Sequence, residues 1–293
     1  MKTKKPTTTL YDRILGALVG FAIGDAMGAT TEFMSQKEIE RKYGQVSNLI
    51  GGGWLHLKPG EVTDDTQMML CVAKAYTQKE QIPFEEGCCK NFVEWYKTNP
   101  KDVGGACARA IVRNEGQPAE DWMKTSIGYQ QLAHQEDLGN GSLMRALFPC
   151  LVEDIPAAIR QGRLTHNNKT CSASINLYGT IISDLLSGNF EVNTQADIMK
   201  EPMEPTGHVS NTLHNALFWL CIAPSFSSAV IGAVNHGGDA DTIAAITGSL
   251  AGARWGYAAI PTEWVDTLDR DIYHAVLSCA EMATDLVTEG YIR

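Results

Sequence analysis

Two stretches of the chain carry small residues at strict four-residue spacing, and this pattern limits the possible folds more than any other. The first stretch, a predicted helix from Tyr11 to about Phe33, has glycine at positions 16, 20, 24 and 28. The second has the small residues Ala244, Gly248, Gly252 and Gly256. Glycine costs about 1 kcal/mol per helix position relative to alanine, so the pattern needs a packing reason. We therefore expect both helices to pack closely in the core, where each can serve as the other's partner.

The same spacing also occurs in membrane helices, but the first stretch is too short for that role. Its uncharged run ends at Asp25 after about eleven residues, whereas a membrane span needs about twenty. The N-terminus lacks the apolar segment of a signal peptide. We expect no transmembrane segment, and we interpret residues 1–10 as a flexible tail.

The rest of the sequence predicts helices and loops, because alternating strand patterns are almost absent. Helices are expected after residue 66, over 84–96, after 105, after the turn at 139–142, over 169–186, 213–221 and 227–234, over 243–255 and within 264–291. The polar segment 187–210 is either a docking loop or a plain connection. With 293 residues and 44% hydrophobic content, the chain is predicted to form one all-α domain over residues 11–293.

Charge and cysteine content exclude several classes of protein. The net charge of -10 argues against a nucleic-acid-binding protein, which would need a basic surface. The eight cysteines are scattered and show no Cys-x-x-Cys spacing, so neither structural zinc nor a disulfide framework is expected. Buried cysteines of this kind indicate a reducing compartment, and we predict a cytoplasmic protein. A monomer is the default expectation.

Two acidic clusters, far apart in the sequence, each precede an apolar helical run. One is His-Gly-Gly-Asp-Ala-Asp-Thr at 236–242, and the other is Thr-Asp-Asp-Thr at 63–66. Aspartate and threonine commonly cap helices, and the helix dipole favours negative charge at this end. Capping therefore explains either cluster alone. Two matching clusters are harder to explain in this way.

Together the clusters supply an all-oxygen set of candidate metal ligands: Thr63, Asp64, Asp65, Asp239, Asp241 and Thr242. Hard oxygen ligands select Mg²⁺ or Mn²⁺. Four crowded carboxylates repel one another, and two divalent cations would neutralise their charge. A binuclear site is therefore a hypothesis, provided that the fold brings the two helix starts together.

Three weaker signals each have a structural alternative. The turn formed by Gly139, Asn140, Gly141 and Ser142 is typical of phosphate-binding helix starts, with Arg145 adding positive charge. A plain turn and a solvated arginine would show the same pattern. His166 is either a cleft residue or a hydrogen-bonded structural histidine, and Glu32 is either a site acid or an exposed side chain.

Four motifs, in order along the chain, resemble those of the ADP-ribosylglycohydrolase family, most closely its nitrogenase-regulating members. They are Gly-Asp-Ala-Met-Gly-Ala-Thr-Thr-Glu-Phe at 24–33, the segment 51–66 that ends in Thr-Asp-Asp-Thr, Gly-Asn-Gly-Ser-Leu-Met-Arg at 139–145, and the cluster at 236–242. The resemblance covers residues 11–270. It implies a compact orthogonal bundle of helices, two Mg²⁺ or Mn²⁺ ions, and hydrolysis of ADP-ribose from modified arginine, with nitrogenase iron protein as the leading candidate target.

The resemblance also implies roles for single residues. The six oxygen ligands above become the metal ligands, and Glu32, Asp102 and Asp65 become the catalytic acids. Substrate contacts are implied for Asp102, Gly139, Asn140, Gly141, Ser142 and His166. Gly105 departs from the pattern, because the nitrogenase-regulating members align with asparagine there. This difference leaves the protein target open.

Several other functions remain open at this point. The chain could remove O-linked ADP-ribose from serine, or protect against an ADP-ribosylating toxin. A two-metal phosphohydrolase could use the same ligands, but it would release phosphate. A non-catalytic, crystallin-like structural protein is the alternative of another class.

Overall fold

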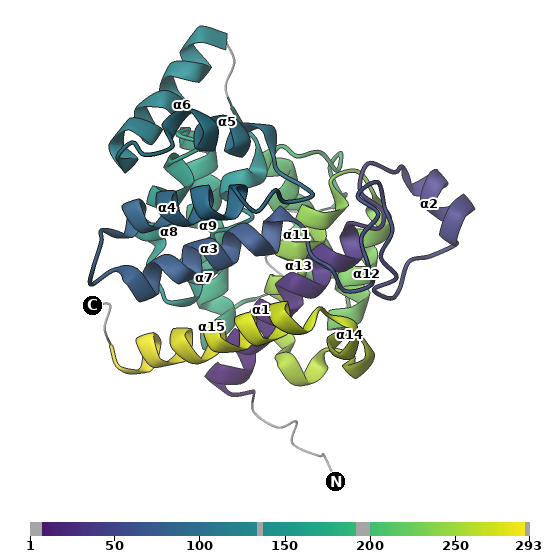
Figure 1. The fold of residues 1–293 in the computed structure, drawn as a ribbon. Coiled ribbons are helices and arrows are strands. Elements are labelled where there is room, and N and C mark those ends of the chain that lie inside the picture. Colours follow the sequence, from purple (N-terminus) through teal and green to yellow (C-terminus); the bar gives the residue numbers. More distant parts are fainter. Residues whose placement is uncertain (1–7, 134–136, 192–199, 291–293) are drawn as a thin grey trace.

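The computed structural model describes residues 8–133, 137–191 and 200–290. Within these residues the chain forms fourteen α-helices, two short 3-10 helices and no strand, which confirms the all-α prediction (Figure 1). The helices are α1 (Leu10–Gly28), α2 (Gln36–Tyr43), α3 (Asp64–Gln78), α4 (Phe84–Tyr96), α5 (Gly105–Asn114), α6 (Ala119–Ala133), η1 (Asn140–Ser142), α7 (Leu147–Leu151), α8 (Ile155–Arg163), α9 (Lys169–Ser187), α11 (Val209–Ile222), α12 (Phe226–His236), α13 (Ala240–Trp255), η2 (Tyr257–Ala259), α14 (Thr262–Thr267) and α15 (Arg270–Thr288).

Helices α1 and α13 lie side by side at the centre of the molecule, with their glycine stripes in contact (Figure 1). A Cβ atom on Gly20 would lie 2.3 Å from the carbonyl oxygen of Gly248, and one on Gly252 would lie 1.9 Å from that of Gly16. These distances are far below van der Waals contact. The expected pairing of the two helices is therefore confirmed, and the contact is backbone against backbone.

The order of the contacts shows that α1 and α13 run antiparallel. Gly16 lies against Gly252, whereas Gly28, at the other end of α1, lies against the Ala240 carbonyl oxygen. The C-terminal end of α1 is thus fixed beside the N-terminal end of α13. As a result, the residues that follow Gly28 lie next to the acidic cluster that opens α13.

Two hydrophobic clusters surround this helix pair. The larger one contains α1 and α13 together with buried faces of α7, α9, α11, α12 and α15. The smaller one contains residues of α3, α4, α5 and α6, including the buried side chains of Met68, Phe92 and Trp122. Helix α3 contributes side chains to both clusters and packs between them.

Several predicted boundaries differ from the structure. Helix α1 ends at Gly28 and not near Phe33, so Glu32 lies in a turn. The 139–142 turn leads into the 3-10 helix η1, and α7 begins only at Leu147. Helices α2, α6 and α8 were not predicted. Helix α2 buries only Ile39, so few apolar residues mark it in the sequence.

Two predicted segments lie partly outside the described residues. Residues 1–7 of the expected tail are outside them, and Thr9 already caps α1 through its side chain. Residues 192–199 of the 187–210 segment are also outside. Among the described helices, none combines the length and apolar character required to cross a membrane.

The glycine contact between α1 and α13 predicts a large loss of stability for Gly20→Ala. The new Cβ would collide with the Gly248 backbone, and we expect the free energy of unfolding to fall by about 3 kcal/mol in urea denaturation. Gly128, in α6, is a matched control because a Cβ there would meet nothing within 4 Å. Gly128→Ala should raise stability by about 0.5–1 kcal/mol. Equal effects of the two substitutions would contradict the packing argument.

Candidate active site

The N-terminus of α3 is organised by Asp25, a buried carboxylate of α1. Its oxygens accept hydrogen bonds from the backbone N–H of Thr63 at 3.0 Å and from both the N–H and the hydroxyl of Thr66. The Thr63 hydroxyl accepts the remaining cap bond, from the N–H of Asp65. Capping here is therefore provided by Asp25 and Thr63. The carboxylates of Asp64 and Asp65 are therefore not needed to cap α3.

At the N-terminus of α13 the carboxylate of Asp241 accepts a hydrogen bond from the Thr242 N–H at 2.9 Å. Asp239 occupies the cap position but makes no side-chain capping bond. Its carboxylate instead accepts a 2.5 Å hydrogen bond from the side-chain amide of Asn140. The Thr242 hydroxyl donates to Asp65 at 3.2 Å. This hydrogen bond links the two acidic clusters directly. The structure therefore brings the two helix starts together, as the metal hypothesis requires.

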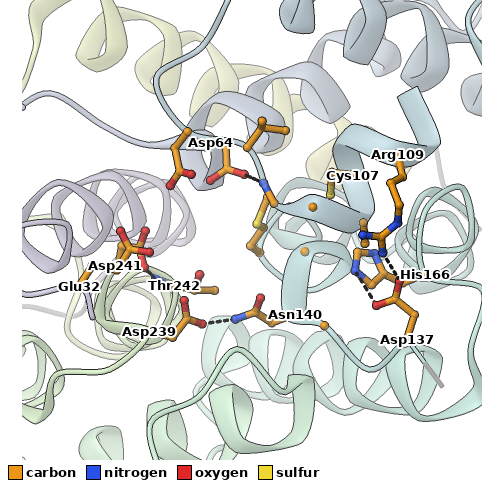
Figure 2. Close-up of a pocket in the computed structure, with 18 of the residues that line it drawn as sticks. Glu32, Asp64, Cys107, Arg109, Asp137, Asn140, His166, Asp239, Asp241 and Thr242 are labelled. Atoms are coloured by element: carbon orange, nitrogen blue, oxygen red, sulfur yellow. Dashed lines mark hydrogen bonds and ion pairs between the residues drawn. The ribbon is translucent and has the colours of Figure 1, made fainter. Parts of the chain in front are cut away.

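Both clusters open onto one cavity of about 470 Å³. The predicted site residues that line it are Glu32, Asp64, Asp102, Gly139, Asn140, Gly141, His166, Asp239, Asp241 and Thr242 (Figure 2). Asp65 lies just outside this lining and is 1% exposed. Thr63 is at the helix cap, also outside the lining. Ser142 is not brought to the cavity, because its side chain is buried against Gly162.

Glu32 is a buried member of this site and not an exposed side chain. It is 6% exposed, and together with Asp239 and Asp241 it offers carboxylate oxygens that lie within 4.8 Å of one another. The indole N–H of Trp54 donates to Glu32 at 2.6 Å and holds its orientation. The antiparallel packing of α1 and α13 explains this grouping, because Glu32 follows α1 and the two aspartates open α13.

The buried carboxylates have raised pKa values. Burial is the largest cause throughout, and it raises the pKa of Glu32 to about 8 and that of Asp64 to about 7, with repulsion from neighbouring carboxylates adding to both. The pKa values of Asp65 and Asp241 are raised well above the usual range for the same two reasons. Burial also raises the pKa of Asp102. The site is therefore unfavourable for negative charge until a cation balances it.

The donor set fits hard divalent cations. Every candidate ligand is a carboxylate or hydroxyl oxygen, the type that magnesium and manganese prefer. One oxygen of Asp65, Oδ2, is buried and has no hydrogen-bond partner. An unpartnered buried carboxylate oxygen is costly unless something positive meets it.

The far end of the cavity contains His166, which is 2% exposed. Its Nδ1 lies 2.7 Å from the Thr165 hydroxyl, and its Nε2 lies 3.8 Å from the Asp137 carboxylate. Burial, with the nearby positive charges of Arg145 and Arg109, lowers the pKa of the imidazole to about 3, so the ring is neutral. A Cβ on Gly139 or Gly141 would lie 3.0 Å from this ring. Glycine at both positions therefore lets the turn pack on the histidine.

Arg145 corrects the expectation of a phosphate-binding arginine beside the 139–142 turn. Its side chain is fully buried and donates to the Gly141 carbonyl at 2.6 Å and the Thr165 hydroxyl at 2.7 Å. It braces the turn from behind. The arginine that lines the cavity is Arg109 of α5, which pairs with Asp137 at 3.3 Å.

Sequence reasoning missed four residues that shape the site: Asp25, Trp54, Arg109 and Asp137. Asp25 carried a usable signal, because it is an acid within the otherwise apolar, glycine-striped helix. Arg109 lies one turn after the paired glycines that open α5, which was a weaker signal. Trp54 and Asp137 had no local signal, since only tertiary contacts bring them to the cavity.

Comparison with known proteins identifies the class of protein that has this all-helical fold. A model of the ADP-ribosylglycohydrolase family matches residues 6–291, and the chain belongs to this family. It is 36% identical over 284 residues to ADP-ribosyl-[dinitrogen reductase] glycohydrolase of Rhodospirillum rubrum, covering 90% of this chain and 92% of the relative.

Other relatives agree with this assignment. The ADP-ribosylarginine hydrolase Tri1 of Pseudomonas putida is 31% identical over 281 residues, covering 87% of this chain and 74% of the relative. A solved structure described as an ADP-ribosylglycohydrolase-related protein complex superposes with a TM-score of 0.76 at 27% identity, covering 94% of this chain and all of that one. The family, the fold and the hydrolase class predicted from the sequence are confirmed.

The raised pKa values predict that the metal-free protein loses stability as pH rises from 6.5 to 8.5. At pH 6.5 the folded state retains protons on Glu32 and Asp64, whose pKa values are about 8 and 7, whereas the unfolded carboxylates have lost theirs; the folded state loses these protons as the pH rises through 7 and 8. Stability should fall by about 1.4 kcal/mol per pH unit for each retained proton. His166 does not oppose this trend, because above its ordinary pKa of 6.5 it is neutral in both states.

This prediction can be checked by thermal unfolding in EDTA across that pH range. The Tm should decrease with pH, and adding Mn²⁺ should restore more stability at pH 8.5 than at pH 6.5. In Asp241→Asn, which removes one crowded carboxylate, the decrease should be smaller. A Tm that rises with pH in EDTA would contradict the electrostatic account.

Proposed function

We propose that the protein hydrolyses the N-glycosidic bond between ADP-ribose and an arginine side chain of a modified protein. The observation that carries this proposal is the asymmetry of the cavity, with five carboxylates at one end and the Arg109–Asp137 ion pair at the other (Figure 2). Two relatives support the arginine linkage, because they are named for hydrolysis of ADP-ribosylarginine. The cavity volume, about 470 Å³, lies within the range of small-molecule sites.

The proposed cofactors are two divalent cations, Mg²⁺ or Mn²⁺. Their proposed ligands are Thr63, Asp64, Asp65, Asp239, Asp241 and Thr242, with Glu32 adjacent to the last three. When bound, such cations would supply positive charge that attracts ribose hydroxyls, and they would act as Lewis acids. The hydrogen bond between the Thr242 hydroxyl and Asp65 supports a single metal centre shared by the two clusters.

The ADP portion of the substrate is proposed to bind toward Arg109. The first turn of α5 lines the cavity beside Arg109, and its cap residue, Gly104, has no side chain that could cap the helix, while its own N–H donates to Asp64. Backbone N–H groups at such a helix start, together with the helix dipole, attract phosphate. Arg109 adds a guanidinium group, whose charge is shared with Asp137 through their 3.3 Å ion pair. Gly139, Asn140, Gly141 and neutral His166 are proposed to contact the sugar, whereas Ser142 is placed too deeply for a direct contact.

The proton transfers are assigned to the carboxylic acids at the other end. Cleavage requires the guanidine to leave protonated or nearly so, and an acid with a raised pKa is suited to that task. Glu32, whose pKa is raised to about 8, fulfils this condition, and the Trp54 indole holds it in place. Asp102 lines the same cavity and is the second candidate, and Asp65 is the third. Glu32 and Asp65 are buried, and their separation from water strengthens their electrostatic effects.

The proposed target is an ADP-ribosylated protein in the cytoplasm, with nitrogenase iron protein as the leading candidate. The Rhodospirillum rubrum relative, named for dinitrogen reductase, supports this choice. Gly105 lies at the start of α5, on the cavity wall. Its lack of a side chain changes the wall at the position where the sequence departs from the nitrogenase-regulating pattern. We propose that the protein acts as a monomer.

We predict that Asp64→Ala or Asp239→Ala abolishes release of ADP-ribose from an arginine-modified protein, lowering kcat/KM by roughly three orders of magnitude. Each variant should remain folded, because removing one of several crowded carboxylates relieves repulsion. Glu120→Ala, at an exposed surface glutamate of α6, is the control and should be fully active.

The measurement is chromatographic detection of released ADP-ribose, with circular dichroism to confirm folding. Full activity of either site variant in metal-free buffer would refute the proposed centre. Release of phosphate in place of intact ADP-ribose would favour the phosphohydrolase alternative. Parallel assays on serine-modified peptides distinguish N-linked from O-linked substrates.

A further inference from the structure

Phe33 and Trp54 form an exposed aromatic pair beside the carboxylate end of the cavity. Phe33 is 68% exposed and Trp54 is 49% exposed, and their ring centroids lie 5.5 Å apart with the planes inclined at 45°. Both rings line the cavity next to Glu32. Large aromatic side chains at this exposure add little to the core, so their placement needs another explanation.

The backbone holds both rings in place. Phe33 adopts a left-handed conformation, with φ of 61°, which is unfavourable for a bulky residue. The bond from its N–H to the Gly238 carbonyl, 2.7 Å long, helps to retain this conformation. On the other side, Gly53 packs so closely on Ala29 that a Cβ would lie 2.1 Å from the carbonyl oxygen. Both segments are thus fastened to the turn that carries Glu32.

The polarity of the cavity indicates which part of a substrate reaches this pair. The ADP portion is proposed to bind toward Arg109 and the first turn of α5, at the opposite end of the cavity from Glu32, Asp239 and Asp241 (Figure 2). The bond to be cleaved then lies at the acidic end. The side chain that leaves must continue away from Arg109, past Glu32. Phe33 and Trp54 flank this route.

We propose that Phe33 and Trp54 form a platform that receives the guanidinium group of the modified arginine and so favours arginine-linked over hydroxyl-linked ADP-ribose. This inference rests on the proposed function. A guanidinium cation is attracted to aromatic faces and stacks on them, whereas a serine oxygen offers neither the charge nor the plane. Glu32, which accepts a hydrogen bond from the Trp54 indole, lies directly beside this platform.

A second groove begins where this platform ends. Phe33 borders both the catalytic cavity and a groove of about 580 Å³ that is lined by residues 34–37 and 202–205 and by His236. An arginine side chain crossing Phe33 would therefore have its own backbone in this groove. The arrangement fits a polypeptide substrate, and Phe33 lies at the junction.

Phe33→Leu and Phe33→Tyr separate the aromatic contribution from simple bulk. With an arginine-linked substrate, Phe33→Leu should raise KM about 3- to 30-fold, whereas Phe33→Tyr should remain within about twofold of the wild type. Inhibition by free ADP-ribose, which lacks the guanidine, should change by less than about twofold in both variants. Ile222→Ala, at a 52%-exposed side chain at the end of α11, is the matched control and should change neither value.

A binding measurement tests the platform independently of turnover. In the wild type with ADP-ribose bound, methylguanidine should shift the NMR signal of the Trp54 indole N–H, which is assigned by its loss in Trp54→Phe. Phe33→Leu should weaken this response by about 3-fold or more. If the wild-type protein shows this NMR response but releases no ADP-ribose from arginine, the proposed function is refuted. The proposal that Phe33 and Trp54 bind guanidinium would still stand.

Two outcomes would overturn the inference. If Phe33→Leu weakens inhibition by ADP-ribose as much as it raises KM, the pair binds ADP-ribose itself and not the arginine. If Phe33→Leu changes neither the KM nor the methylguanidine response, the pair has no part in substrate recognition.

Discussion

The rest of the structure depends on the direct backbone contact between α1 and α13. At this contact the glycines leave no space for a Cβ atom, since one on Gly248 would lie 2.0 Å from the Gly20 carbonyl oxygen. Close approach of two long buried helices fixes both their distance and their register. Because the helices are antiparallel, the turn after α1 carries Glu32 to the start of α13, where Asp239 and Asp241 lie. The contact between α1 and α13 therefore determines both the packing of the core and the geometry of the site.

The cluster of buried carboxylates in the site lowers the stability of the folded protein, and the proposed chemistry requires it. Burial raises the pKa values of its carboxylic acids, so a metal-free protein must either retain protons or tolerate repulsion. Neutral partners hold the geometry without cancelling the charge: Trp54 donates to Glu32, Asn140 to Asp239, and the Gly104 N–H to Asp64. These donors leave oxygens available for a cation, and the unpartnered Oδ2 of Asp65 is the clearest case.

The opposite ends of the cavity differ in charge, and this difference gives a substrate one favoured orientation. Arg109 and the start of α5 suit a diphosphate, whereas the carboxylates and the Phe33–Trp54 pair suit cations. A molecule that carries an anionic ADP group at one end and a guanidinium at the other matches both. The proposed function and the proposed aromatic platform thus follow from the same electrostatic asymmetry.

The sequence by itself determined the all-helical class, the pairing of the glycine stripes and the two acidic helix starts, because these are local patterns with the period of a helix. The six proposed ligands could be read from it for that reason. The tertiary structure alone decided which side chains face the cavity. Arg145 follows the 139–142 turn in sequence but is buried behind it, while the distant Arg109 lines the site. Trp54 reaches Glu32, and Asp25 caps α3, only through contacts between separate segments. Such contacts depend on how whole helices pack, and no local spacing encodes them.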